Sequence, residues 1–260
     1  MTDRLDPQAI AAALAGPDGA VEVRVVDACA STNAALLGVD APGPVLMIAD
    51  HQTRGRGRRG RRWHSAPGTG LLMSLRRVSR RPLRDLPGLS LAAGVAAVRA
   101  LRTLGLDRVA LKWPNDLLVD GAKLGGILVE TRIQGDAVAI VAGIGINWHD
   151  APDAPSLRRK AVCVSRMAAP VPARTAGAIA IARELLAALA EFDARGLEAF
   201  RGEWEAAHAH AGFRMRIRLG DGRMVSGTAD GIGTDGSLRL RTRGGLREVL
   251  SGTVVSARAA

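Results

Sequence analysis

The amino-acid sequence predicts an α+β protein, in which a mixed or antiparallel sheet is covered by helices and a small all-β unit follows at the C-terminal end. Strand and helix patterns alternate over about the first hundred residues, and a run of strands separated by turn residues follows at 109–147. No helical period occurs from Phe213 onward. With 260 residues, 47% of them hydrophobic, the chain has enough apolar material for one large and one small domain.

Helix starts and apolar strands define the first half of the chain. Asp6 before Pro7 is typical of a helix N-terminus, and Ser31 is a second capping residue. We expect strands at 21–26, 45–49 and 69–75, and helices at 8–14, 31–37 and 89–104. The last of these helices is strongly apolar, so we expect it to be central to the core.

The second half is predicted to contain an antiparallel meander, two helices and the small all-β unit. Turn pairs containing Asn, Asp and Gly separate the strands of the meander. Helical composition returns at 173–194 and 197–210. Between 213 and 255 we expect four short strands, divided by Asp-Gly and Gly-Gly pairs, that form a small barrel.

Apolar runs and cysteines indicate the cellular location. No uninterrupted apolar run reaches 18 residues, so the sequence predicts no membrane-spanning segment, and the run Ile10–Ala15 is too short for a signal peptide. Cys29 and Cys163 lie in apolar surroundings without metal-ligand spacing, as expected of buried thiols in a reducing compartment. We therefore expect a cytoplasmic protein.

Positive charge is concentrated in one part of the chain. Residues 54–84 contain eleven arginines and no lysine or acidic residue, which equals the formal charge of +11 for the whole chain. The remaining residues therefore sum to zero. A general nucleic-acid-binding protein spreads basic residues over its surface, whereas this pattern indicates one local loop that meets anions.

The segment 54–62, RGRGRRGRR, is the densest part of this stretch. Its residues favour three interpretations: a loop for a small anionic ligand, a nucleic-acid-binding segment and a solvated loop. A P-loop is excluded because no Gly-Lys-Ser/Thr follows, and Trp63 and His64 do not begin the apolar helix of a dinucleotide fingerprint. We expect the glycines to make the loop mobile when empty and to let it order around ligand anions.

Three further motifs place small or polar residues at the ends of predicted strands. KWPND at 112–116 presents a carboxamide beside a carboxylate, which suits a nucleotide sugar, a base edge, Mg²⁺ or an ordinary turn. KLGGIL at 123–128 has two glycines after a lysine, where a ligand can approach the backbone closely. GIGIN at 143–147 ends another strand in the same way, and a β-bulge is the alternative.

Together these motifs resemble those of biotin protein ligases, enzymes that attach biotin to a lysine of biotin-dependent carboxylases. The resemblance spans Val21–Val255 and is carried, in order, by Ser31-Thr32-Asn33, by Gln52 with Gly55–Gly60 and Trp63, by KWPND, by KLGGILVE and by GIGIN. It implies a catalytic domain at 1–211 of the biotin-lipoate ligase type, similar to class II aminoacyl-tRNA synthetases. It also implies a small SH3-like barrel at 212–260.

The resemblance implies a two-step reaction. Biotin and ATP form biotinyl-5′-adenylate and pyrophosphate, and a carrier-protein lysine then takes the biotinyl group and releases AMP. The residues implied to be catalytic are Lys123, Arg56 and Arg58. The residues implied to bind biotin are Ser31, Thr32, Asn33, Gln52, Arg56, Gly57, Arg58, Lys123, Gly126 and Gly143. Those implied to bind ATP or the adenylate are Arg58, Arg59, Trp63, Asn115, Asp116, Lys123 and Asn147, with Asp116 as the Mg²⁺ ligand.

The implied partner is the biotin carboxyl carrier domain of an acetyl-CoA or acyl-CoA carboxylase, and we expect a monomer or weak homodimer. Family members that also repress transcription carry an N-terminal winged-helix domain. About 20 residues precede the first predicted strand here, so we expect no repressor activity and no DNA partner. For the arginines between Arg76 and Arg84 we expect a solvated surface, with docking of an acidic carrier as the alternative.

Two alternative functions stay open. A lipoate- or octanoate-type acyl ligase or transferase has a similar fold, and biotin-stimulated pyrophosphate exchange separates it from a biotin ligase. A nucleic-acid-binding protein would show steeply salt-dependent affinity for DNA or RNA and no response to biotin. The zero net charge outside 54–84 argues against this second alternative.

Overall fold

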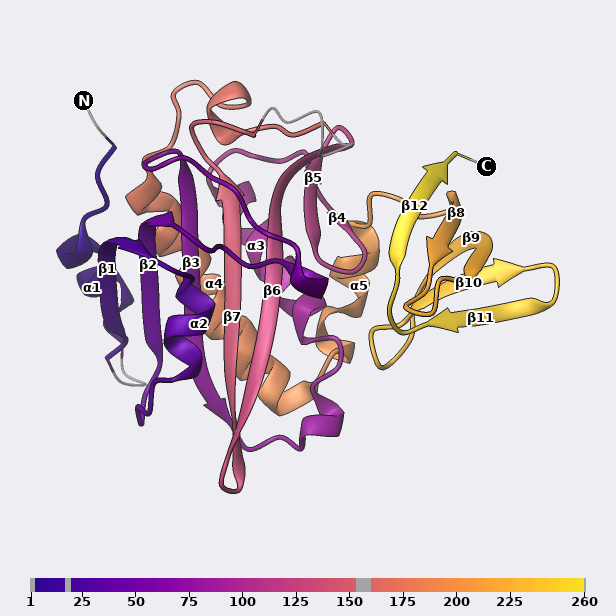
Figure 1. Cartoon of the computed structure of the whole chain (residues 1–260), viewed down its shortest axis with the longest axis horizontal. Coiled ribbons are helices and arrows are strands. Elements are labelled where there is room, and N and C mark those ends of the chain that lie inside the picture. The colour runs from indigo at the N-terminus through magenta and orange to yellow at the C-terminus, as the bar shows by residue number, and fades with distance from the viewer. Residues whose placement is uncertain (1–2, 17–19, 153–159, 260) are drawn as a thin grey trace.

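The computed structural model describes residues 3–16, 20–152 and 160–259, which contain two β-sheets and several helices (Figure 1). The larger sheet has seven strands in the order β1-β2-β3-β7-β6-β5-β4. β1 and β2 are parallel, and the other neighbouring pairs are antiparallel. The strands are β1 (Glu22–Cys29), β2 (Val45–Gln52), β3 (Gly70–Ser79), β4 (Val109–Lys112), β5 (Asp116–Val119), β6 (Ala122–Gln134) and β7 (Ala137–Asn147). The predicted α+β class and the antiparallel meander of β4 to β7 are confirmed.

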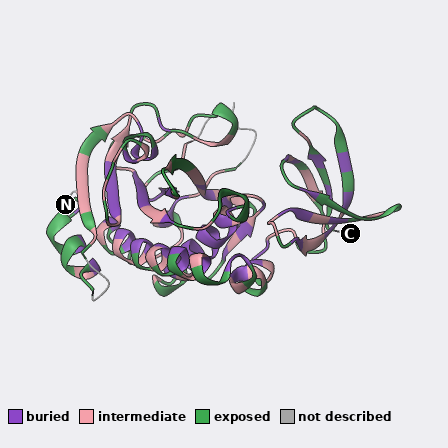
Figure 2. Cartoon of the chain, turned by 90° about the horizontal axis from the view of Figure 1, so that it is seen from below, coloured by how far each residue is buried: buried purple, intermediate pink, exposed green. Residues whose placement is uncertain are grey.

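Helices cover the two faces of the larger sheet unequally (Figure 1). α3 (Leu89–Thr103) and α4 (Arg174–Arg195) lie on one face, with α5 (Glu198–Ala206) against α3 and α1 (Pro7–Leu14) against α4. α2 (Thr32–Leu37) lies on the opposite face, where the chain after β2 also crosses the sheet. Figure 2 shows the buried sides of the long helices turned toward the sheet. The α2 face is the less covered one, and the candidate site lies on it.

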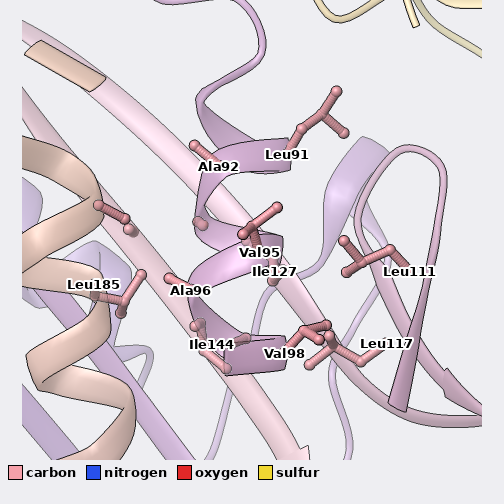
Figure 3. Close-up of a cluster of buried hydrophobic side chains, with 14 of the residues drawn as sticks. Leu91, Ala92, Val95, Ala96, Val98, Leu111, Leu117, Ile127, Ile144 and Leu185 are labelled. Carbon is pink, nitrogen blue, oxygen red and sulfur yellow. The ribbon is translucent and has the colours of Figure 1, made fainter. Parts of the chain in front are cut away.

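α3 forms the centre of the core between α4 and the larger sheet. Small buried residues such as Ala96 allow α4 to pack closely against it. Figure 3 shows Val95 and Val98 in the same apolar cluster as Ile127 and Leu117 of the sheet. The prediction that the 89–104 helix is central to the core is confirmed.

Both predicted helix caps are present. Asp6 Oδ1 accepts hydrogen bonds from the backbone N–H groups of Gln8 at 2.9 Å and Ala9 at 3.0 Å, at the start of α1. Ser31 Oγ accepts from Ala34 N at 3.5 Å, at the start of α2. The second cap has a further consequence, because it fixes the residues that form one wall of the site.

α5 is shorter than the predicted helix at 197–210. It ends at Ala206 because the following backbone pairs with β4. Leu111 N donates to Ala207 O at 2.7 Å, and Ala209 N donates to Leu111 O at 2.8 Å. The predicted end of this helix was therefore wrong, since pairing with an edge strand replaces its last turn.

Residues 214–258 form a second sheet of five antiparallel strands, and the prediction of four was wrong. The strands are β8 (Arg214–Arg218), β9 (Met224–Ile232), β10 (Leu238–Thr242), β11 (Gly245–Val249) and β12 (Thr253–Arg258), in the order β11-β10-β9-β8-β12. Three of the turns contain the Asp-Gly and Gly-Gly pairs that predicted them. β12 was missed because it follows Leu250-Ser251-Gly252, which contains no such pair.

No helix among the described residues is long and apolar enough to cross a membrane. Cys163 is buried and Cys29 is half-buried, and both are free thiols. Burial raises the pKa of Cys29, so its thiol stays protonated near neutral pH.

Arg76 corrects the expectation of a solvated arginine surface at 76–84. Its side chain is fully buried on β3. Its Nη1 donates to Ala41 O and its Nη2 donates to Gln134 Oε1, both at 2.9 Å. The expectation was wrong for Arg76 because two acceptors from distant segments replace its contact with water, whereas Arg80 is exposed as expected.

Arg76→Ala is expected to lower the free energy of unfolding by about 2–3 kcal/mol, because it leaves two buried acceptors without a donor and opens a cavity. Urea unfolding measures this loss. Arg80→Ala is the matched control, and its effect should stay within about 0.5 kcal/mol of the parent protein. Equal midpoints for the two variants would contradict a structural role for the buried guanidinium.

Candidate functional site

A cavity of about 230 Å³ lies on the α2 face of the larger sheet. β6 and β7 form its floor, the start of α2 forms a wall and residues 56–63 cover it. All predicted site residues except Arg59 line this cavity, namely Ser31, Thr32, Asn33, Gln52, Arg56, Gly57, Arg58, Trp63, Asn115, Asp116, Lys123, Gly126, Gly143 and Asn147. The fold thus brings the separate sequence motifs to one place.

Glycines form the floor of the cavity. Gly126 of β6 and Gly145 of β7 are directly opposite each other in the sheet, and the Trp63 ring lies over both. A Cβ at Gly145 would be 2.8 Å from Trp63 Cε2, so no larger residue fits without moving the ring. The alternate residue Ile144 belongs to the core cluster around α3 (Figure 3). Strand alternation therefore explains GIGIN, with isoleucines in the core and glycines under the cavity.

A hydrogen-bond network fixes the wall formed by α2. Thr32 N donates to Gln52 Oε1 at 2.8 Å. Ser74 Oγ lies 2.7 Å from Thr32 Oγ1 and 2.6 Å from Asn33 Oδ1. Asn33 lies directly above Gly143, where an added Cβ would collide with its Oδ1. Because Thr32, Asn33 and Ser74 are buried, these polar groups are held in fixed positions away from bulk water.

Glu130 of β6 joins this network to the loop at 54–62, which we call the arginine loop. Asn33 Nδ2 donates to Glu130 Oε2 at 2.9 Å, and Arg56 Nη2 lies 3.0 Å from Glu130 Oε1. One carboxylate therefore contacts both a wall residue and a loop residue. Arg56 is about half exposed, so its position over the cavity depends on this ion pair.

Lys123 reaches the cavity from the start of β6. Its Nζ lies 2.6 Å from Asp116 Oδ1 and 5.5 Å from the centroid of the Trp63 ring. The side chain of Lys123 is 30% exposed and that of Asp116 is 10% exposed, so water screens this ion pair only in part. The missing side chain at Gly126 leaves room for the ammonium, because a Cβ there would be 3.3 Å from Nζ. Lys123 is thus a cation that an anion entering the cavity would meet.

The two predicted carboxamides contact main-chain carbonyls. Asn115 Nδ2 donates to Ile127 O at 2.6 Å. Asn147 Nδ2 lies 3.3 Å from Lys123 O and 3.1 Å from Val162 O. These contacts hold the backbone around Lys123, and the implied role of both amides in ATP binding stays a prediction.

The arginine loop has a defined backbone path between β2 and β3. Gly57 N donates to Arg61 O at 2.7 Å, and Trp63 N donates to Gly55 O at 3.0 Å. A Cβ at Gly55 would be 2.7 Å from Trp63 O, so this close approach requires glycine. Gly55 therefore lets the loop turn back on itself tightly, and the mobility of the empty loop stays a prediction.

Arg58 and Arg59 lie in different places. Arg58 lines the cavity, where burial lowers its pKa and repulsion from neighbouring arginines lowers it further. Arg59 lies outside the cavity, and its Nη1 and Nη2 donate to Thr253 Oγ1 and Ser251 Oγ, both at 3.0 Å. Arg59 thus connects the loop to the C-terminal sheet, and its implied role in ATP binding stays a prediction.

Ser74 and Glu130 were missed by sequence reasoning. Ser74 is a hydroxyl within the apolar stretch GLLMSL of β3. Because a buried polar residue needs a hydrogen-bond partner, its position in this stretch could have indicated a polar contact. Glu130 is the last residue of KLGGILVE, but nothing in that motif shows that it faces Asn33. Neither residue lines the cavity itself; the lining residues outside the predicted set are Arg61, Arg62, His64, Met73, Ile127, Leu128, Ile144, Gly145, Pro152 and Ala161.

The donor set does not fit a magnesium ion held by the protein alone. Among the described residues no group of three or more His, Cys, Asp or Glu side chains could hold a metal ion. Asp116 is the carboxylate in the cavity lining, and Lys123 contacts one of its oxygens. Magnesium is usually bound through one or two carboxylates together with substrate phosphates. The site therefore suits magnesium only as part of a nucleotide complex.

Comparison with known proteins identifies the family of this chain. The family model described as the Biotin/lipoate A/B protein ligase family matches residues 30–147, which contain the cavity motifs. The biotin--[acetyl-CoA-carboxylase] ligase of Mycobacterium tuberculosis is 34% identical over 274 residues, covering 99% of this chain and 100% of the relative. This chain belongs to the biotin protein ligase family. The resemblance carried by the five motifs is thereby confirmed.

Two other members of the biotin protein ligase family show how much of the chain is shared. The structure of the biotin protein ligase from Aquifex aeolicus in complex with biotin and ATP has a TM-score of 0.79 and 26% identity, covering 92% of this chain and 99% of that one. The bifunctional ligase/repressor BirA of Escherichia coli is 36% identical over 209 residues, covering 80% of this chain and 64% of BirA. This chain thus spans about two thirds of the length of that curated relative.

Proposed function

We propose that this member of the biotin protein ligase family is an ATP-dependent ligase that forms biotinyl-5′-AMP and transfers biotin to a lysine of a biotin carboxyl carrier protein. The supporting observation is the arrangement of the cavity. Neutral polar groups of Thr32, Asn33 and Gln52 form the α2 wall, and the cations Lys123 and Arg58 line the cavity near Asp116. Biotin has the matching chemistry, with a ureido ring that donates and accepts hydrogen bonds and a carboxylate.

Two relatives add support for this choice of substrates. The full-length relative is named a biotin--[acetyl-CoA-carboxylase] ligase, and the Aquifex aeolicus structure contains biotin and ATP. In our proposal the carrier is accordingly the biotin carboxyl carrier domain of an acetyl-CoA or acyl-CoA carboxylase.

In the first step, an oxygen of the biotin carboxylate attacks the α-phosphorus of ATP. The bond from this phosphorus to the oxygen that bridges to the β-phosphate breaks, and pyrophosphate leaves. Two unit charges of like sign about 4 Å apart repel by about 4 kcal/mol at an effective dielectric constant near 20. Lys123 and Arg58 offset this repulsion, and Asp116 orients the Lys123 ammonium toward the reacting groups.

In the second step, the neutral amine of the carrier lysine attacks the carbonyl carbon of the mixed anhydride. The new amide bond forms, AMP leaves with the electron pair of the broken bond, and the amine proton passes to solvent. Lys123 and Arg58 stabilise the negative charge on the departing phosphate. Trp63 covers the glycine floor, and its indole ring stacks on the adenylate.

Mg²⁺ enters the reaction as part of the MgATP substrate. The protein residues that surround the nucleotide supply hydrogen bonds and positive charge, and no step of the proposal depends on a metal ion held by the protein. The role of Asp116 as a magnesium ligand stays a prediction beside its observed contact with Lys123.

The loop at 54–62 is expected to close over biotin and ATP. Its arginines repel one another until ligand anions enter, and Arg56 already has an anchor on Glu130. Biotin plus MgATP should therefore slow tryptic cleavage within the loop by about tenfold, measured by mass spectrometry of the fragments. Cleavage after Arg223, an exposed residue between β8 and β9, serves as the internal control. Unchanged cleavage of the loop would contradict closure.

The proposed function is tested by incubating the protein with biotin, MgATP and the apo carrier domain of an acetyl-CoA carboxylase. We expect biotinylation of the carrier that requires ATP, detected by streptavidin blot. We also expect pyrophosphate exchange that is stimulated by biotin and not by lipoate or octanoate. Exchange driven only by lipoate or octanoate would instead identify an acyl ligase of that type. DNA or RNA binding without any exchange would identify a nucleic-acid-binding protein.

We further propose that residues 1–211 form the catalytic domain and that residues 212–260 form an SH3-like barrel. The separation of the strands into a seven-stranded and a five-stranded sheet supports this division. A cytoplasmic location and a monomeric or weakly dimeric state stay predictions.

A further inference from the structure

β8 carries a row of arginines on its solvent side. Its sequence RMRIR alternates, so that Met215 and Ile217 are buried and Arg214, Arg216 and Arg218 are exposed. None of these three arginine side chains has a hydrogen bond or ion pair with another residue that the structure describes. The row therefore does not stabilise the sheet through internal contacts.

The neighbouring strand β12 adds a fourth arginine to this row. Arg258 is exposed and directly opposite Arg214 in the β8–β12 pair, and its side chain has no hydrogen bond or ion pair within the described part of the chain. Like charges directly opposite each other in an antiparallel pair destabilise a sheet. We define the arginine face as Arg214, Arg216, Arg218 and Arg258. Its local cost to stability indicates a use other than folding.

The C-terminal sheet is basic, although the residues outside 54–84 sum to zero net charge. Residues 212–260 contain nine arginines and four acidic residues, a formal charge of +5. The zero net charge outside 54–84 therefore conceals a basic C-terminal segment that acidic residues elsewhere balance. Two arginines toward the other side of this sheet, Arg239 and Arg241 of β10, are paired, since both contact Asp230. No ion pair joins the four arginines of the arginine face to an acidic side chain within the part of the chain that the structure describes.

The arginine face begins beside the arginine loop at 54–62. Thr253 is opposite Arg218 in the β8–β12 pair, so both side chains lie on the same face. Thr253 Oγ1 also accepts the hydrogen bond from Arg59 of the loop. The basic surface thus extends from the C-terminal sheet to the cover of the cavity. A macromolecule bound on this face lies beside the cavity.

We propose that the arginine face binds an acidic surface of the biotin carrier protein and so brings its target lysine to the cavity; this inference rests on the proposed function. Carboxylates of the carrier would meet guanidinium groups that have no internal partner. Single-stranded nucleic acid fits less well, because it binds by stacking on aromatic residues and Phe213 is the one Phe, Tyr or Trp at 205–260. The cluster at 76–84 also fits less well, because Arg76 is buried.

The test compares two double variants that remove the same charge from the same sheet. Arg214→Thr/Arg216→Thr neutralises half of the arginine face. Arg243→Thr/Arg247→Thr removes two exposed arginines near the β10–β11 end and is the matched control. Threonine favours strands, and loss of Arg214 relieves its repulsion with Arg258, so we expect the face variant to unfold at or above the parental temperature.

Two measurements separate docking from adenylation. Biotin-stimulated pyrophosphate exchange reports the first step, and the KM for the apo carrier domain reports docking. In the face variant we expect unchanged exchange and a KM raised by about tenfold at low salt, with a weaker dependence on salt than in the parent. The control variant should stay within about twofold of the parent in both measurements.

A parental KM in the face variant would overturn the proposal. An equal rise in both variants would also overturn it, because it would reflect overall charge rather than this face. DNA or RNA binding that is lost in the face variant, together with an unchanged carrier KM, would assign the face to nucleic acid instead. Absence of pyrophosphate exchange in the parent protein would contradict the proposed function itself and is therefore distinguishable from these results.

Discussion

Lys123→Ala is expected to reduce biotin-stimulated pyrophosphate exchange by about a thousandfold while the protein stays folded. The Lys123 ammonium lies 2.6 Å from Asp116 Oδ1 and faces the cavity in which two substrate anions would meet. Alanine removes this cation and leaves the Asp116 carboxylate without it, beside those anions. The double variant Lys123→Ala/Asp116→Asn should therefore recover about tenfold of the lost rate, measured as incorporation of labelled pyrophosphate into ATP.

Lys160→Ala is the matched control for the loss of Lys123. Lys160 is an exposed lysine, and its variant should exchange pyrophosphate within about twofold of the parent rate. Lys123→Arg tests the need for a compact cation: Nζ is already 3.3 Å from the Cβ position at Gly126, and a planar guanidinium needs more room. We expect Lys123→Arg to be as inactive in pyrophosphate exchange as Lys123→Ala. Parental exchange by Lys123→Ala would disprove the assignment of Lys123.

Gly143→Ala is expected to weaken biotin binding by about a hundredfold, which corresponds to about 2.8 kcal/mol. The added methyl group would collide with Asn33 Oδ1, which lies 2.6 Å from Ser74 Oγ. Moving Asn33 also disturbs its hydrogen bond to Glu130. Each buried polar group that loses its partner costs about 1–3 kcal/mol, so two such losses account for the expected effect. Isothermal titration with biotin measures it directly.

Gly202→Ala provides the control for this glycine substitution. Gly202 lies within α5, where a Cβ would meet nothing within 4 Å. Alanine there should leave biotin affinity unchanged and raise the free energy of unfolding by about 0.5–1 kcal/mol, because glycine is a poor helix former. If Gly143→Ala binds biotin with parental affinity, the close contact between Asn33 and the floor does not set the shape of the site.

Local structure could be predicted wherever a single residue type has one strong preference. Asp6 and Ser31 predicted the helix starts because their side chains satisfy backbone N–H groups at the first turn. The end of α5 and the existence of β12 could not be predicted in the same way. Both depend on pairing with strand edges, offered by β4 and β8, that exist only after the sheets have formed.

The members of the candidate site could be predicted more readily than its geometry. Motif resemblance found fourteen of the residues that line the cavity, but it did not indicate that Arg59 would contact Thr253 or that Glu130 would join Asn33 to Arg56. These contacts link distant parts of the chain, so no local pattern encodes them. The charge pattern predicted a solvated surface at 76–84, and this was wrong for Arg76. Arginine is normally exposed, whereas Arg76 is buried.

The glycine floor has a consequence for changing the acid that the proposed ligase would accept. At Gly126 and Gly145 the floor is bare main chain, so every substitution there adds atoms and makes the compartment smaller. Extra volume for a bulkier acid has to come from residues that have side chains to lose, such as Met73 and Leu128 in the lining. Engineering toward larger biotin analogues should therefore start at these positions and leave the two glycines unchanged.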